Sequence, residues 1–184
     1  VVFAKGKYHL YCENETAADM GTIAHWTATE PEGPWQLSSI PALLPGPPGA
    51  WDFAGFSESR VNYVNGVFHL FYSSASQHAD GRRRLRSTSQ RRRLGHDEET
   101  IGYAFSFDGY NFTKSIQNPV VRREAIPGVS AMAESHAYHE PPFVYVYHTT
   151  RWFGDFNGVD GAHNINGYAA VIHDSCVSVR ACDV

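Results

Sequence analysis

The sequence predicts an all-β fold built from repeated units, and two observations support this prediction. The apolar runs are short, and Pro or Gly separates most of them in a chain that is 14% aromatic with 16 Gly and 10 Pro. Short apolar runs bounded by such residues are typical of strands and disfavour long helices. In addition, one pattern of strands and turns recurs about every 60 to 80 residues, which is typical of a β-propeller with four-stranded blades enlarged by loops.

The first part of each repeat is a turn followed by an aromatic strand. Residues 6–11 (GKYHLY) match residues 66–71 (GVFHLF) in their Gly, His and Leu, and both carry aromatic residues at the same two places. Residues 143–149 (FVYVYHT) supply a third strand of this kind. Three aromatic strands in equivalent places predict three blades or parts of blades.

The later part of each repeat is a second strand next to a polar turn, at residues 22–26, 100–104 and 166–169. We therefore predict a single partial propeller domain over residues 1–184. It divides into part of a blade at residues 1–50, a blade at 51–126, and a blade at 127–184 with an unassigned C-terminal tail. Closed propeller rings commonly have four to eight blades, so we expect the chain to be a fragment of a larger ring.

Two glutamates occupy the same place in two repeats. Residues 58–73 and 134–149 align without a gap, and each begins with Glu-Ser, at Glu58 and at Glu134. A solvent-exposed Glu at a strand start needs no function, but such a position has no reason to recur with the same Ser after it. We expect the two carboxylates at equivalent positions in successive blades, an arrangement suited to acid/base chemistry.

Several segments resemble one known group of enzymes. Residues 51–61 (WDFAGFSESRV), 65–73 (NGVFHLFYS), 101–109 (IGYAFSFDG) and 118–120 (NPV) resemble a blade of the five-bladed β-propeller glycoside hydrolases, families 43 and 32 and their relatives. Residues 28–35 (ATEPEGPW) resemble the Gly-Pro-aromatic turn of that group. The resemblance implies a glycosidase with a funnel-shaped active site on the ring axis, to which the innermost strands of successive blades contribute acidic residues.

The resemblance also implies three roles for those acids: a general acid, a base or nucleophile, and a modulator of the acid. Glu58 fits the general acid, because its spacing to Gly66 and the strand that follows match the family pattern. The two residues after it differ from that pattern. Ser-Arg stands there, where family 43 has a small residue and Pro and family 32 has Cys-Pro. Glu134 is the alternative acid, with Glu58 then as modulator. If Glu58 is the acid, the base and the modulator are expected before Val1, and the fragment alone is expected to be inactive.

Five further residues are candidates for the site. Asp52 is a weaker catalytic candidate, because it also fits a turn that leads into a strand. Arg60 and His136 each follow a glutamate by two positions, so strand alternation predicts them on the face of the carboxylates, as sugar-binding groups or as interblade ion-pair partners. Arg151 and Trp152 follow the third aromatic strand, where Trp152 could stack on a sugar ring or pack between blades.

Charge and targeting signals are less informative. Seven arginines fall between residues 82 and 93 in a chain of net charge -4. They could bind a polyanion or an acidic substrate, but the absence of interleaved aromatic residues favours a solvated loop. We therefore expect a carbohydrate partner and neither nucleic acid nor a membrane, because no apolar run has membrane-spanning length. Glycosylation triplets at Asn14 and Asn111 favour a secreted protein, although the first residues of the sequence do not have the pattern of a signal peptide.

Cysteines and histidines give no metal signature. Cys176 and Cys182 are close enough in sequence for a disulfide, which would leave Cys12 as a buried thiol. The histidines divide into His9, His69 and His148, predicted to pack within aromatic strands, and His136, His139 and His163, which follow turns and could approach the axis. No cofactor is expected, and the spacing fits no zinc site. The resemblance leaves room for a central calcium held by a His and waters.

Three functions remain open at this point. The first is a glycoside hydrolase, and the second is a non-catalytic carbohydrate-binding propeller. The third is a propeller sugar phosphorylase, which needs phosphate-binding residues such as Arg60, His136 and Arg151.

Overall fold

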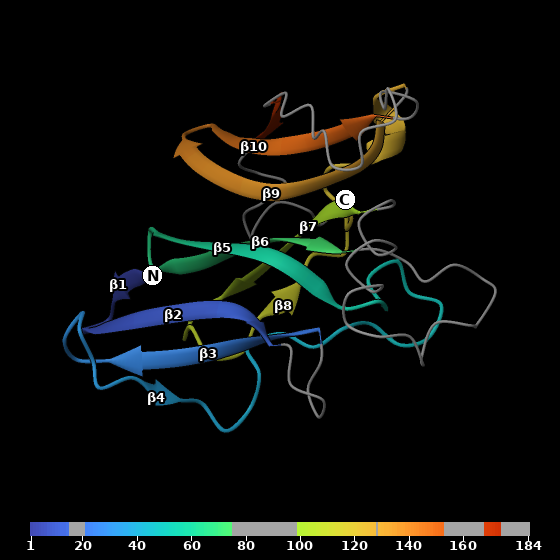
Figure 1. Ribbon diagram of the computed structural model, residues 1–184. Coiled ribbons are helices and arrows are strands. Elements are labelled where there is room, and N and C mark those ends of the chain that lie inside the picture. The colour runs from blue at the N-terminus through green and yellow to red at the C-terminus, as the bar shows by residue number, and fades with distance from the viewer. Residues whose placement is uncertain (15–20, 75–98, 128, 153–167, 174–184) are drawn as a thin grey trace.

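The computed structural model describes residues 1–14, 21–74, 99–127, 129–152 and 168–173. In these residues the chain forms three antiparallel β-sheets that follow one another along the sequence (Figure 1). The described residues include one short 3-10 helix, η2 (Arg123–Ala125), and no helix long enough to cross a membrane. The prediction of an all-β fold is confirmed.

Each sheet is a simple meander in which sequence neighbours pair. The first sheet contains β1 (Val2–Ala4), β2 (Lys7–Asn14), β3 (Thr22–Ala28) and β4 (Gln36–Leu37). The second contains β5 (Phe56–Val64), β6 (Val67–Ser74), β7 (Thr100–Ser106) and β8 (Thr113–Lys114). The third contains β9 (Val129–Glu140), β10 (Phe143–Trp152) and β11 (Tyr168–His173). The first sheet has four strands, where the sequence predicted only part of a blade.

The first two sheets begin with the same hairpin. Lys5 and Gly6 join β1 to β2 with φ angles of 51° and 77°, and Asn65 and Gly66 join β5 to β6 with φ angles of 51° and 84°. Positive φ at both central residues is the mark of the type I′ turn, which matches the twist of two paired strands. The repeat seen in the sequence is therefore a repeat of backbone geometry.

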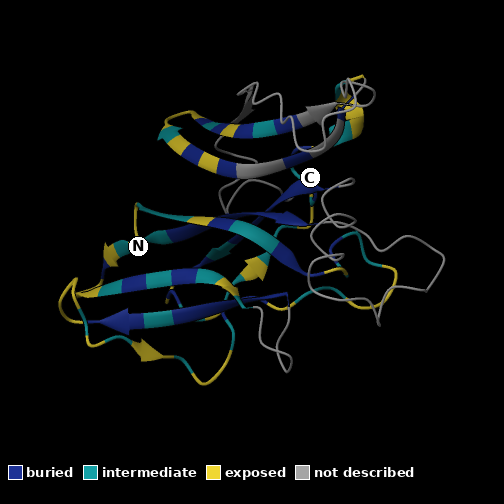
Figure 2. Ribbon diagram, viewed as in Figure 1, coloured by how far each residue is buried: buried dark blue, intermediate teal, exposed yellow. Residues whose placement is uncertain are grey.

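The sheets stack face to face, and two hydrophobic cores fill the spaces between them (Figure 2). Leu70 and Tyr72 of β6 face the first sheet, whereas Phe71 between them belongs to the core shared with Met132 and Val144 of the third sheet. From its second residue to its last, β6 is buried, as expected for a central strand with a sheet on each side.

The first strands of the three sheets are neighbours. β5 contacts both β1 and β9, and the Asn62 side-chain amide donates a 2.6 Å hydrogen bond to the backbone carbonyl of Ala137 in β9. In Figure 1 the chain runs in the same direction in β5 and β9. The first strand of each blade therefore lines a common inner edge, and the starts of β5 and β9 lie at the same end of it.

Candidate functional site

Both glutamates of the repeat lie at β-bulges in these inner strands. In β5, Ser57 pairs with Ser73 and Ser59 pairs with the adjacent Tyr72, so Glu58 is an extra residue in the ladder. A bulge locally disrupts pairing and redirects side chains, and bulges are frequent next to active sites.

The corresponding irregularity in β9 falls at Glu134. His136 pairs with Tyr147 and Ala133 pairs with Thr149, so Glu134 and Ser135 together oppose His148. The structure describes the backbone of Glu134 but not its side chain. The two glutamates thus share a backbone feature as well as a place in the repeat.

The backbone of Glu58 has an unusual conformation. Its φ angle is 27°, a region that residues with a side chain rarely adopt. Such a conformation costs about 1 to 3 kcal/mol, and it persists only where the surrounding structure enforces it, often at functional sites. The side chain is half-buried, and its Oε2 atom is shielded from solvent.

The serine that follows each glutamate is buried. Ser59 is 8% exposed and Ser135 is 0% exposed, and neither hydroxyl has a hydrogen-bond partner among the described residues. The repeated Glu-Ser pair thus combines an acidic residue at a bulge with a small residue that the interior can accept. An ordinary surface position would not require the second feature.

Arg60 and His136 are both exposed on the inner strands, shortly after the bulges. Simple alternation predicted them on the face of the carboxylates, but the bulge at Glu58 interrupts the alternation in β5. Strand alternation therefore does not by itself put the Arg60 side chain on the same face of β5 as the Glu58 carboxylate. Their exposure at the inner edge leaves both side chains accessible to a ligand.

Asp52 lies in a buried ion pair and not in the candidate site. Its carboxylate is buried and forms an ion pair with Lys114 at 2.5 Å, and the Lys114 ammonium also lies over the Phe56 ring. Burial, and secondarily the charge of Asp52, raises the pKa of Tyr72. Lys114 belongs to β8, the last strand of its blade, whereas Glu58 is in the first. We interpret Asp52 as a structural residue, whose ion pair with Lys114 stabilises the segment that leads into β5.

Sequence reasoning missed a buried acid, Glu99. It is 5% exposed, and its Oε1 accepts a 2.7 Å hydrogen bond from the Ser57 hydroxyl. The sequence signal for a buried Glu99 was its position directly before the apolar residues of β7. The signal was weak, because Glu99 is also the last residue of the charged stretch that contains the arginine cluster.

The histidines predicted to pack within strands do so. A ring nitrogen of His9 lies 3.0 Å from His25, that of His69 lies 2.8 Å from the Tyr103 hydroxyl, and that of His148 lies 3.4 Å from the Thr149 carbonyl. All three rings are buried. Burial lowers the pKa of His148, which lies opposite the bulge of β9.

Other candidates are less defined. His136 is exposed, and the ring of His139 is tilted against that of His69 with ring centroids 4.5 Å apart. No group of residues arranged to hold a metal ion occurs in the described part of the chain, and the central calcium remains a prediction. Cys12 is a half-buried free thiol, and burial raises its pKa. The side chains of Arg151 and Trp152, the arginine cluster, His163, Cys176 and Cys182 all lie outside the described residues.

Comparisons with known proteins bear on the fold. The sucrose-6-phosphate hydrolase of Lactobacillus gasseri matches 94% of this chain with a TM-score of 0.61 and 15% identity. A family 117 glycoside hydrolase from the marine bacterium Zobellia galactanivorans matches 92% with a TM-score of 0.57 and 20% identity. The chain has the β-propeller fold of the glycoside hydrolases. It covers 30% and 43% of these two proteins, respectively.

One curated relative is also a carbohydrate-active enzyme. The 1,2-β-oligomannan phosphorylase of Thermoanaerobacter sp. is 27% identical over 120 residues, which are 65% of this chain and 36% of the relative. No protein-family model matches the chain. The chain thus spans less than half the length of each of these three proteins.

Proposed function

We propose that the full-length protein cleaves glycosidic bonds by carboxylate acid/base chemistry, with Glu58 and Glu134 as two carboxylates of the active site. The observation that supports this proposal is the pair of β-bulges, one at each glutamate in the two adjacent inner strands. A surface glutamate needs neither a bulge nor a strained backbone, whereas a reacting carboxylate needs a fixed orientation.

The chemistry needs one carboxylic acid to protonate the leaving oxygen and one carboxylate to activate water or to attack the sugar carbon. We assign the acid role to Glu58, because the structure holds its backbone in a strained conformation. Glu134 is then a second carboxylate of the active site beside Glu58. A carboxylate on a further blade of the ring would supply the base. In the alternative assignment Glu134 is the acid and Glu58 is its modulator, since a neighbouring negative charge favours the protonated form of a carboxylic acid.

Arg60 and His136 are proposed as substrate-binding residues. Both are exposed on the inner strands that carry the glutamates. A guanidinium and an imidazole can donate hydrogen bonds to sugar hydroxyls, and both also suit a phosphate. Arg151 and Trp152 remain predicted contacts near the end of β10.

Phosphorolysis is the second candidate function, favoured by the similarity to an oligomannan phosphorylase. In a phosphorylase, phosphate replaces water as the attacking group, and Arg60 and His136 would hold it. The acid that protonates the leaving oxygen is needed in both reactions, so Glu58 keeps its role.

A product analysis tests the proposal. The full-length protein is incubated with β-1,2-mannan oligosaccharides and with fructosides, with and without inorganic phosphate, and the products are separated by chromatography. Free sugar in the absence of phosphate indicates hydrolysis, and sugar phosphate formed only when phosphate is present indicates phosphorolysis. Binding of oligosaccharides without any cleavage would contradict the proposal and would favour a carbohydrate-binding propeller.

A further inference from the structure

We infer that Glu99 is a positioning residue that fixes the two inner-strand glutamates relative to each other. This inference rests on the proposed function, since it concerns the geometry of the same site. Glu99 directly precedes β7, is almost fully buried and touches both inner strands.

Two hydrogen bonds connect Glu99 to these strands. Its carboxylate accepts the Ser57 hydroxyl at 2.7 Å, and Ser57 is the residue before Glu58. Its backbone carbonyl accepts the amide of Met132 at 2.8 Å, and Met132 lies shortly before Glu134 in β9. A single residue therefore holds each inner strand immediately before its bulge.

The position of Glu99 is set by the sheet. Ser57 pairs with Ser73 of β6, and Ser73 pairs with Ile101 of β7. Directly paired residues project from the same face of a sheet, and Ile101 belongs to the core between the second and third sheets. Ser57 and its partner Glu99 thus lie on the face that packs against β9.

The bulges explain why such support is needed. An extra residue leaves the local ladder incomplete, and the φ angle of 27° at Glu58 persists only if neighbouring contacts enforce it. The Ser57–Glu99 bond anchors the residue that enters the bulge. Loss of the anchor would let the Glu58 carboxylate move, and a displacement of about 1 Å can lower a rate about a hundredfold.

The test uses variants of the full-length protein on the substrate that it cleaves. Glu99→Ala is expected to lower kcat by about ten- to a hundredfold while KM changes less than about threefold, because positioning affects the reacting groups more than binding. Glu99→Gln keeps an oxygen that accepts the Ser57 hydroxyl and is expected to retain kcat within about threefold. Ser57→Ala should reproduce the loss of kcat. The Ser57→Ala/Glu99→Ala double variant should be no slower than Glu99→Ala, because both substitutions break the same Ser57–Glu99 hydrogen bond.

A matched control lies at the other end of β7. The hydroxyl of the buried Ser106 donates a 2.8 Å hydrogen bond to the exposed Asp108 carboxylate and accepts the backbone amides of Asp108 and Gly109, so Ser106→Ala also removes a serine–carboxylate bond. This variant should lower the melting temperature and leave kcat unchanged.

Two results would overturn the inference: a kcat for Glu99→Ala as high as that of Ser106→Ala, or a Glu99→Gln variant as slow as Glu99→Ala. If Glu99→Ala does not fold, the Ser57→Ala and Glu99→Gln pair gives the same decision. A wild-type protein that cleaves no substrate would instead refute the proposed function, and the inference with it.

Discussion

Replacing Glu58 by Gln in the full-length protein is expected to lower kcat by about 10²- to 10⁴-fold, the range for loss of a general acid or base. Glu58→Gln removes the proton and the charge while keeping the size of the side chain at the bulge of β5. Oligosaccharide affinity should therefore persist, measured by calorimetry beside the kinetic assay. Glu134→Gln should also lower kcat strongly, because Glu134 lies at the corresponding bulge of the adjacent inner strand β9.

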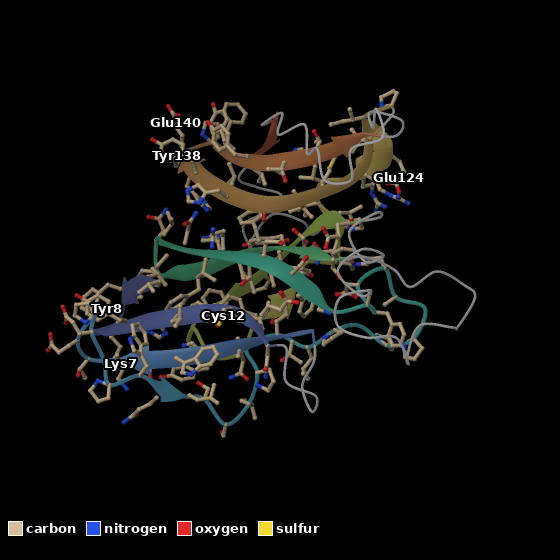
Figure 3. All side chains as sticks on the ribbon, in the orientation of Figure 1. Lys7, Tyr8, Cys12, Glu124, Tyr138 and Glu140 are labelled. Atoms are coloured by element: carbon tan, nitrogen blue, oxygen red, sulfur yellow. The ribbon has the colours of Figure 1, made fainter. Side chains whose placement is uncertain are left out.

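The control for these variants is Glu140→Gln. Glu140 is an exposed residue at the last position of β9, so it shares a strand with Glu134 but not the bulge. Figure 3 shows Glu140 and Tyr138 at the end of β9 that is far from Glu124 of η2, which lies near the start of β9. Activity in Glu140→Gln should equal that of the wild type. Full activity in both Glu58→Gln and Glu134→Gln would refute the carboxylate assignment.

Stability is expected to fall between pH 6.5 and pH 4 because of a buried histidine pair. His9 and His25 stack with ring centroids 5.2 Å apart and are 2% and 1% exposed. The Ser38 hydroxyl lies 3.0 Å from the second ring nitrogen of His25. Burial, together with the neighbouring His9, lowers the pKa of His25 from 6.5 to about 4, and burial also lowers the pKa of His9.

The direction of this change in stability follows from proton binding. Between pH 6.5 and 4 the unfolded chain binds a proton at His25 that the folded protein does not, so the free energy of unfolding is highest above this window and decreases as the pH falls through it. The loss from His25 amounts to at most about 3 kcal/mol. Urea unfolding at several pH values measures it, and His25→Gln should flatten the curve relative to the wild type. Parallel curves for the two proteins would contradict the role of this histidine.

The order of strands was predictable because it depends on local sequence. Aromatic strands such as β2 and β6 follow a glycine turn of one type, and the repeated turn made the blades visible. The shortest strands, β4 and β8, have two residues each and were not predictable, because their pairing depends on the neighbouring strand rather than on their own periodicity.

The candidate site was predictable only in part. Recurrence identified Glu58 and Glu134, but a bulge depends on the register with a second strand, and one strand read alone does not contain that information. The same limit applies to Asp52, because its partner Lys114 lies on a distant strand of the blade. Glu99 was missed for a related reason, since its contacts are to two other strands.

The most direct test of the account is a crystal structure of the full-length Glu58→Gln protein with an oligosaccharide bound. We predict a sugar beside the bulges of β5 and β9, with its glycosidic oxygen about 3 Å from the side chain at position 58 or from Glu134, within reach for proton transfer. Arg60 or His136 should contact a sugar hydroxyl in the same complex. A sugar that binds elsewhere and touches neither glutamate would contradict the central claim.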